Sequence, residues 1–245
     1  MNPNEDVMLK DYSALSFDIY GTVIDWETGI LTNMRPLTDR LSQEMSDDEV
    51  LQLHARMESS HQALTPAKGY SSLLATVYRR CAEAMGLATD WEACETYGNS
   101  VGNWPAFEDS AEALAYLKQH YKMIALSNVD NRSFAGSAAK LGIAWDGTYL
   151  AEDIGSYKPN QRNFDYLLGM IDALGIEKAQ LLHTAESMFH DHVPARGNGL
   201  DNAWIYRRHA KTGFGATMDP GKLAETTYCF NSLREMAEAH EKGDI

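Results

Sequence analysis

The chain alternates between short apolar runs and amphipathic segments over most of its length. The first run, Tyr12–Phe17, ends at Asp18, and Gly21-Thr22 then breaks it, which predicts a buried strand that leads into a loop. After Pro105, similar runs predict strands at 122–126, 147–150, 180–183 and 203–206, and the segments between them predict helices at 108–120, 131–141, 163–173, 192–197 and 232–242. Strands that alternate with crossover helices indicate a parallel sheet that is covered on both faces.

The stretch between these two parts has a helical pattern throughout. Ser46 with Glu49 three residues later is typical of a helix start, and glycines separate two further helices predicted at 70–85 and 91–97. We therefore predict an α/β protein whose parallel-sheet core is made of residues 1–25 and 105–245, with an inserted helical cap at 26–104. Ligands of such sheets bind at the carboxyl ends of the strands, so the insert would close over the site as a lid.

Composition and charge exclude two classes of function. The 245 residues include 21 Lys and Arg against 35 Asp and Glu, which gives a formal net charge of −14. This balance argues against a nucleic-acid-binding protein and against attachment to an anionic membrane surface, because both need a basic face. It does not exclude an anionic substrate, since a site can hold local positive charge.

The sequence also bears on cellular location. No apolar run approaches the ~18 residues that a membrane span needs, and Met1–Asp11 lacks the basic-then-apolar order of a signal peptide. The three cysteines form no Cys-x-x-Cys pair, so we expect neither a disulfide framework nor a structural zinc site. These observations predict a cytoplasmic protein.

Four groups of side chains that carry chemistry follow predicted core strands. They are Asp18 with Thr22, Ser127-Asn128, Lys158-Pro159, and Glu186 with Asp191. Because the carboxyl ends of parallel strands meet at one edge of the sheet, we expect these groups to converge. An Asp before Gly commonly forms a turn. With a lysine in register, Asp18 also fits a carboxylate nucleophile that attacks carbon or phosphorus and forms a covalent intermediate.

The other groups fit supporting roles at such a site. Ser127 and Asn128 either begin a plain loop or cradle a substrate carboxylate or phosphate. The ammonium of Lys158 would offset the negative charge that gathers near Asp18 as substrate binds. Asp191 would pair with that lysine.

Three further features near the site are expected to be structural. Asp25 is expected to cap the helix that follows it. Trp26 and Trp104 flank the two crossings between core and cap, where packing is their expected role and lining the cleft is the alternative for either. No metal site is predicted from the histidines, because their directions do not converge in any simple way: His183, His190 and His192.

These residues carry a resemblance to the haloacid dehalogenase superfamily, most closely to its type II branch, the L-2-haloacid dehalogenases. The similar segments span nearly the whole chain: Phe-Asp-x-Tyr-Gly-Thr at 17–22, Leu-Ser-Asn at 126–128, Tyr-Lys-Pro at 157–159 and His-Asp-His-Val-Pro-Ala at 190–195. The resemblance implies a Rossmann-like core with an inserted four-helix cap. It also suggests a homodimer.

Tyr20 separates two branches of this superfamily. The phosphatases have Asp two residues after the nucleophile, where it protonates the leaving alcohol, and they need magnesium. The dehalogenases have Tyr there and work without metal. A phenol is a poor proton donor at neutral pH, and a departing halide needs no proton. The resemblance therefore implies a hydrolase without metal or cofactor, with Tyr20 among its substrate-binding residues.

The resemblance also implies the reaction. Asp18 would attack the carbon that bears the leaving group and form an ester, which water hydrolyses to release a 2-hydroxy acid. Thr22 and Asn128 would hold the nucleophile and the substrate. Ser127 and backbone amides would hold the substrate carboxylate, and Lys158 would stabilise charge on the nucleophile.

The predicted substrate is a small 2-substituted carboxylic acid, foremost a 2-haloacid. The same displacement would open a strained ring that carries a carboxylate, such as an azetidine carboxylate. A magnesium-dependent phosphatase is an alternative that Glu186 favours and Tyr20 opposes. A non-catalytic binding protein is a second alternative, which the intact Asp18, Lys158 and Asp191 oppose.

The chain departs from familiar dehalogenases at several positions. Phe164 stands where they carry Tyr, and residues 186–188 stand where they carry Ser-x-Asn. We include Glu186 among the predicted substrate-binding residues. Three roles remain open for it: an ion pair with Lys158 or pairing with a cap residue, a metal ligand, or a base that orients water. In the cap, Arg56 is the candidate for the arginine that the family places near substrate.

Overall fold

The computed structural model describes residues 7–243. Residues 1–6 and 244–245 of the predicted core lie outside this range, and with them part of the Met1–Asp11 segment considered for a signal peptide. Among the described residues, no helix is long and apolar enough to cross a membrane.

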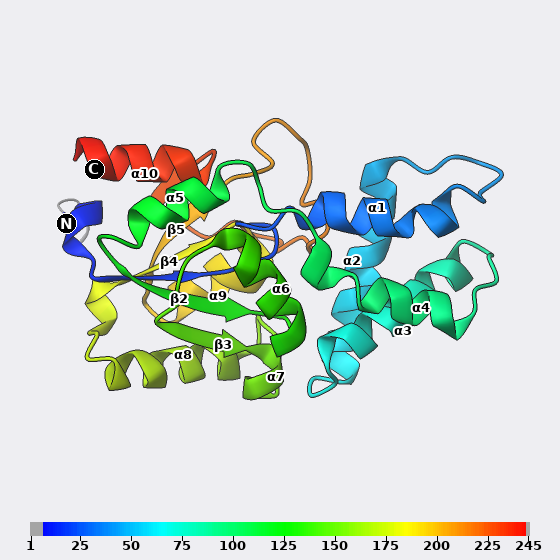
Figure 1. Ribbon diagram of the computed structural model, residues 1–245, viewed down its shortest axis with the longest axis horizontal. Helices are drawn as coiled ribbons and strands as arrows, with labels where there is room; N and C mark the ends of the chain where they lie inside the picture. Colours follow the sequence, from blue (N-terminus) through cyan, green and yellow to red (C-terminus); the bar gives the residue numbers. More distant parts are fainter. Residues whose placement is uncertain (1–6, 244–245) are drawn as a thin grey trace.

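A six-stranded sheet forms the centre of the fold, and every neighbouring pair of strands is parallel (Figure 1). The strand order is β3-β2-β1-β4-β5-β6. The strands are β1 (Ala14–Phe17), β2 (Lys122–Ser127), β3 (Gly147–Leu150), β4 (Leu181–Ala185), β5 (Asp201–Ile205) and β6 (Tyr228–Phe230). The predicted α/β class is confirmed, while β6 is a strand that the sequence analysis did not predict.

The central strand β1 is buried on both faces. Leu15 and Phe17 pack into one hydrophobic cluster, and Ala14 packs into the other, as the alternation of side chains along a strand requires. Phe17 is in register with Ala125 of β2 and Thr184 of β4. The last residues of β1, β2 and β4 therefore end at the same edge of the sheet.

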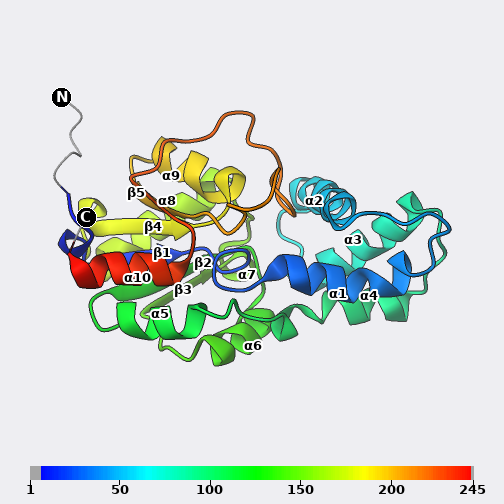
Figure 2. The ribbon, with the colours of Figure 1, turned by 90° about the horizontal axis from the view of Figure 1, so that it is seen from above.

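Helices cover both faces of the sheet (Figure 2). On one face lie α5 (Ser110–Leu117), α6 (Asn131–Leu141) and α10 (Leu233–Lys242); on the other lie α8 (Gln161–Ala173) and α9 (Val193–Gly197), with the short α7 (Ala151–Ile154) against α8. Four single-turn segments complete the chain: the 3₁₀ turns η1 (Leu9–Asp11), η2 (Val101–Asn103) and η3 (Lys178–Gln180), and the π-helical turn η4 (Met188–His192).

Four helices lie beyond the carboxyl edge of the strands (Figure 1). They are α1 (Trp26–Thr38), α2 (Asp47–Leu64), α3 (Tyr70–Ala84) and α4 (Trp91–Gly98). The predicted capping box of Ser46 and Glu49 begins α2, and the side chain of Asp25 caps α1 as predicted. All four helices fall within the range predicted for the cap, although the division into two domains itself stays a prediction.

The two crossings between these parts lie side by side. The main-chain N–H of Asp25 donates to the carbonyl of Pro105 at 2.8 Å. Trp104 packs directly on Gly29 of α1, where a Cβ atom would lie only 2.3 Å from the indole ring. The helical part is therefore anchored where it leaves and rejoins the sheet.

Candidate active site

Asp18 lies directly after β1, where the chain makes a tight turn. The main-chain N–H of Ile24 donates back to the carbonyl of Ile19 at 2.9 Å. Gly21 has a φ of +96°, in the left-handed region that glycine enters without strain. The turn brings Thr22 back beside Asp18, and the threonine hydroxyl donates to Oδ2 at 2.7 Å.

A buried ammonium group holds the other oxygen of Asp18. Lys158 Nζ donates to three oxygens: Asp18 Oδ1 at 3.0 Å, Asp191 Oδ1 at 2.7 Å and the carbonyl of Leu126 at 2.9 Å. Burial opposes the charge on Lys158, but the two carboxylates outweigh burial and raise its pKa. The lysine therefore remains an ammonium ion between two carboxylates.

The two carboxylates differ in their surroundings. Asp191 has a second partner, His183, whose Nε2 lies 2.9 Å from Oδ1. Burial alone would raise the pKa of Asp191, but Lys158 and His183 hold it well below its usual range. At Asp18, burial raises the pKa against the pull of Lys158 and Thr22, and Asp191 adds to the rise. Asp191 is thus the permanent anion, and Asp18 is the more basic carboxylate and the better nucleophile.

The end of β2 supplies Ser127 and Asn128. The Asn128 amide holds the main chain of Lys158 at both ends: Nδ2 donates to its carbonyl at 2.9 Å, and its N–H donates to Oδ1 at 2.6 Å. Ser127 is 3% exposed, and its Oγ has no hydrogen-bond partner among residues 7–243. A buried hydroxyl without a partner is costly, so Ser127 marks a position where a ligand oxygen would be stabilised.

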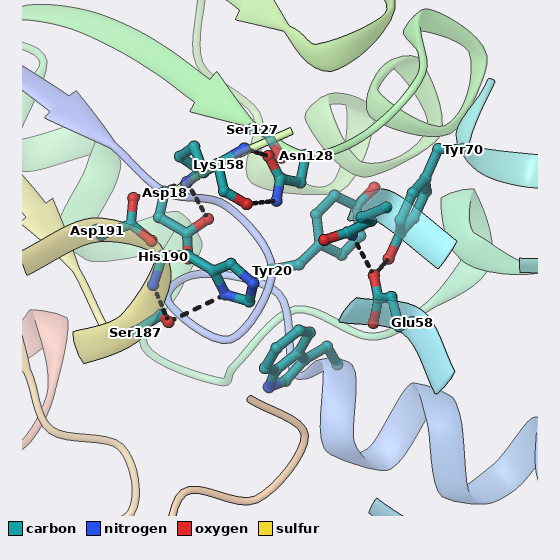
Figure 3. A pocket seen from close by; sticks show the side chains of 12 residues that line it. Asp18, Tyr20, Glu58, Tyr70, Ser127, Asn128, Lys158, Ser187, His190 and Asp191 are labelled. Carbon is teal, nitrogen blue, oxygen red and sulfur yellow. Dashed lines mark hydrogen bonds and ion pairs between the residues drawn. The ribbon is translucent and has the colours of Figure 1, made fainter. Parts of the chain in front are cut away.

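These groups surround a pocket of about 30 Å³ (Figure 3). A volume of this size holds about two water molecules or the few atoms of a very small ligand. The core contributes Asp18, Tyr20, Ser127, Asn128, Lys158, Ser187, His190 and Asp191, and the helical part contributes Trp26, Glu58, Gln62 and Tyr70.

A carboxyl group from α2 lies on the cap side of this pocket. Glu58 Oε1 accepts hydrogen bonds from Tyr70 Oη at 2.9 Å and from Gln62 Nε2 at 3.0 Å. Burial raises the pKa of Glu58 to about 7, against the hydrogen bond from Tyr70. Behind it, burial lowers the pKa of His54 to about 3, so the imidazole is neutral. In Figure 3, Asp18 lies on one side of the pocket and Glu58 on the other.

His190 lines the core side of the pocket and lies on the turn η4, next to Asp191. Its Nδ1 is 3.1 Å from Ser187 Oγ, and within the described chain Nε2 has no hydrogen-bond partner. Burial lowers the pKa of His190 to about 4, with Lys158 acting in the same direction and Asp191 against it. The ring is therefore a neutral imidazole with a free nitrogen at the pocket.

Not every residue predicted for the site reaches the pocket. Arg56 is on an exposed face of α2 and does not line the pocket. The buried polar residues of α2 lie four apart, at positions 54, 58 and 62, and a step of two residues turns a helix by about 200°. The expectation that Arg56 contacts substrate therefore has no support in this geometry.

Glu186 lines a second pocket. Its main-chain N–H donates to Thr22 Oγ1 at 2.8 Å, but its carboxylate lines a neighbouring pocket of about 230 Å³ together with Glu27, Arg207 and Arg208. Burial raises the pKa of Glu186 to about 8, and Glu27 adds to the rise. Among the described residues it forms no ion pair, so the anticipated pair with Lys158 or a cap residue is absent there.

Tyr20 lines the pocket while its hydroxyl is held elsewhere. The hydroxyl lies 2.8 Å from Ser137 Oγ on α6, and the ring packs edge-on against Trp104, with centroids 5.9 Å apart. Trp104 is buried in this packing, as expected, whereas Trp26 also lines the pocket.

Five lining residues were not predicted from the sequence: Glu58, Gln62, Tyr70, Ser187 and His190. The spacing of His54, Glu58 and Gln62 was the available signal for the first two, because it marks one polar face of α2. For His190, the sequence analysis considers only a metal-binding role.

The side chains at Asp18 do not fit a magnesium site. Lys158 already occupies the space between Asp18 and Asp191, and Glu186 lines the other pocket. Nowhere in residues 7–243 do three His, Cys, Asp or Glu side chains converge in a metal-ligating group. Metal independence itself stays a prediction.

No protein-family model and no curated protein matches the chain, but solved structures do. The L-2-haloacid dehalogenase PA0810 is 22% identical, with a TM-score of 0.72 over 94% of this chain and 99% of that one. The L-2-haloacid dehalogenase from Xanthobacter autotrophicus with chloropropionic acid covalently bound is 16% identical, with a TM-score of 0.75 over 94% and 98%.

A third solved structure is described only as a putative hydrolase. The putative HAD-hydrolase YfnB from Bacillus subtilis, bound to magnesium, is 16% identical, with a TM-score of 0.71 over 96% of this chain and 99% of that one. Identities this low establish a common fold rather than a common reaction. The predicted resemblance is thus confirmed at the level of the fold, and the chain has the α/β fold of the haloacid dehalogenase superfamily.

Proposed function

We propose that the protein is a metal-independent hydrolase in which Asp18 displaces the leaving group from the α-carbon of a small 2-substituted carboxylic acid. The observation that carries this proposal is the buried arrangement of Asp18, Lys158 and Asp191 at a small pocket. A binding protein has no need of a carboxylate held in this way, and Tyr20 leaves the site without the acid that a phosphatase needs.

In the first step an oxygen of Asp18 forms a bond to the α-carbon. The bond to the leaving group breaks, and the electron pair departs with it. A halide leaves as a stable anion, so no proton donor is required. Lys158 and Thr22 fix the carboxylate in place before attack, which lowers the entropic cost of reaching the transition state.

The substrate carboxylate is expected to bind at the end of β2. Ser127 Oγ is the buried donor without a partner among the described residues, and main-chain amides of the same loop would add to it. Asn128 acts indirectly, because both ends of its amide hold the main chain of Lys158.

In the second step water attacks the carboxyl carbon of Asp18 and frees the 2-hydroxy acid. His190 is a suitable proton acceptor, since its free Nε2 faces the pocket as part of a neutral imidazole. The alkoxide takes up a proton as it leaves, and the carboxylate of Asp18 is restored beside Lys158.

The test is the release of halide from chloro-, bromo- and fluoro-substituted short acids with a chelator present, combined with the mass of the protein. We expect turnover that survives the chelator and a transient adduct on Asp18. Both should vanish in Asp18→Asn and persist in Asp172→Asn, an exposed aspartate on α8. If no substrate forms an adduct on Asp18, the displacement mechanism is wrong.

The cytoplasmic location and the homodimer remain proposals. Light scattering of the purified protein tests the second directly, with a mass near 27.3 kDa expected for a monomer and twice that for the proposed dimer.

A further inference from the structure

The pocket has an unusual charge balance for a site that takes a simple haloacid. The carboxyl groups of Asp18, Asp191 and Glu58 all line it. Among the described lining residues, Lys158 is the cation, and its three hydrogen bonds already go to Asp18, Asp191 and a carbonyl. A haloacid would bring one more negative charge into this space, and burial makes repulsion between like charges costly.

The buried side chain of Glu58 is held in place by hydrogen bonds. It is 6% exposed, and Tyr70 from α3 and Gln62 from α2 fix Oε1. Oε2 accepts no hydrogen bond within residues 7–243. The nearest nitrogen is His54 Nδ1 at 3.5 Å, and it is not oriented to hydrogen-bond. The carboxyl group is therefore preorganised and has one oxygen left for a ligand.

Within the part of the chain that the structure describes, no positively charged side chain bonds to Glu58. On α2, the imidazole of His54 is neutral, because burial lowers its pKa to about 3. From α3 and α4, Tyr70 and Tyr97 are buried phenols whose pKa burial raises well above its usual value. Burial likewise raises the pKa of Tyr157, from the loop before α8. A ligand is the remaining source of positive charge for this carboxyl group.

The positions of Asp18 and Glu58 suggest where that charge lies. Displacement at carbon requires the leaving group to depart on the side opposite the nucleophile. Asp18 projects from the core and Glu58 from the cap, on opposite sides of the pocket (Figure 3). We infer that Glu58 binds a positively charged nitrogen of the substrate and that this nitrogen is the leaving group that Asp18 displaces.

The substrate class that follows is a small cyclic amine carrying a carboxylate. An ordinary amine is a poor leaving group, whereas a three- or four-membered ring releases strain when its C–N bond breaks. The carboxylate of the substrate would bind at Ser127, where the hydroxyl lacks a partner in the described chain. This inference rests on the proposed displacement by Asp18.

The step balances without any further reactant. A bond forms between an Asp18 oxygen and the ring carbon adjacent to the carboxylate, the C–N bond breaks, and the electron pair goes to nitrogen. The nitrogen leaves as a neutral amine that keeps its hydrogens and stays bonded to Glu58. Water then hydrolyses the ester, and the amine takes up the proton released, which gives an amino-2-hydroxy acid.

The experiment compares two substrates, azetidine-2-carboxylate and 2-chloropropionate. Ring opening converts a secondary amine into a primary amine, which a reagent selective for primary amines detects, and the other reaction releases chloride. We expect Glu58→Gln to lower kcat/KM for azetidine-2-carboxylate about 10- to 100-fold, the loss of one charge-assisted hydrogen bond. The ratio of kcat/KM for azetidine-2-carboxylate to kcat/KM for 2-chloropropionate should fall by the same factor, because only the first substrate carries a positively charged nitrogen.

Two variants serve as controls. Glu58→Asp keeps the charge and should retain part of the preference for the amine, and Glu92→Gln, an exposed residue of α4, should change neither reaction. Thermal unfolding confirms that each variant is folded. Equal losses on both substrates in Glu58→Gln overturn the inference.

The mass of the protein separates this inference from the proposed function. An adduct on Asp18 with 2-chloropropionate alone overturns the inference and leaves the displacement mechanism standing. The absence of an adduct with either substrate overturns both. An adduct with azetidine-2-carboxylate that Glu58→Gln suppresses supports both.

Discussion

Lys158 is the residue on which the charge of the site depends. Its ammonium is the shared partner of Asp18 and Asp191, and all three side chains are buried. A buried ion pair is weak evidence of stability, but removing one partner leaves uncompensated charge at a cost of about 3–5 kcal/mol. The geometry therefore ties the reactivity of Asp18 and the stability of the fold to one side chain.

Lys158→Met tests this coupling. Without the ammonium, Asp18 and Asp191 would face each other unscreened, and the pKa of Asp18 would rise further. We expect adduct formation to fall by at least about 100-fold and urea denaturation to show a loss of about 3–5 kcal/mol in unfolding free energy. Lys222→Met, at an exposed loop position, should leave both unchanged. Normal activity in Lys158→Met would remove the lysine from the mechanism.

His190→Gln tests the second step separately from the first. The glutamine cannot accept the proton of the attacking water, so hydrolysis should slow by about 100-fold or more, while attack by Asp18 continues. Mass spectrometry should then find the adduct accumulating on Asp18, with one rapid turnover followed by a slow steady state. His209→Gln, at an exposed histidine, is the control. Steady-state rates that drop without any accumulation would argue against His190 as the base.

At the scale of elements, the sequence predicts the strand ends and the cap helices, but not which face of α2 points toward the site. The strands before Asp18, Asn128 and Glu186 are mostly apolar and almost completely buried, as expected for parallel strands that are covered on both faces. The three-residue β6 is too short to show a period, and the turn η4 takes the place of the start of a helix predicted from residue 192.

The sequence did not show which face of α2 points toward the site, for a different reason. The buried face of α2 includes three polar residues, His54, Glu58 and Gln62, and the last two line the pocket. Hydrophobicity identifies the face of a helix that is buried in a core, but it cannot distinguish a polar face toward a site from one toward water. The prediction for Arg56 rests on its position along the chain. An error of two residues in that position moves a side chain to the opposite face of the helix.

The tight turn after β1, which contains Gly21, provides a prediction about this structural element. Gly21→Ala forces a residue with Cβ into the left-handed region, at a cost of about 1–2 kcal/mol, and places that Cβ 3.0 Å from Trp26 Nε1. We expect lower unfolding free energy, altered tryptophan fluorescence and weakened activity. Gly86→Ala also places a residue with Cβ at a positive φ, +70°, but no atom lies within 4 Å of its Cβ. Gly86→Ala should lower stability without lowering activity. An equal loss of activity in Gly86→Ala would show that backbone strain, rather than contact with Trp26, is responsible.

For the molecule as a whole, buried titratable groups on both sides of the cleft set how stability depends on pH. Burial lowers the pKa of His54, His190 and His192 to about 3, 4 and 4. The unfolded chain takes up protons at these positions below about pH 6.5, so stability falls as the pH drops. Burial raises the pKa of Glu58 to about 7 and of Glu186 to about 8. There the folded state holds the extra protons, so stability falls as the pH rises from about 4.5 to 8.

These opposing slopes place the stability maximum contributed by the five groups near pH 6.5, because three histidines outweigh two glutamates below that value and are silent above it. Each group changes the unfolding free energy by at most about 1.4 kcal/mol per pH unit. The variant Glu58→Gln/Glu186→Gln removes the alkaline slope. Urea denaturation at pH 5, 6.5 and 8 should therefore show the variant gaining on the native protein steadily toward pH 8, while Glu92→Gln follows the native protein throughout. If the double variant runs parallel to the native protein between pH 6.5 and 8, neither glutamate is held protonated by the fold.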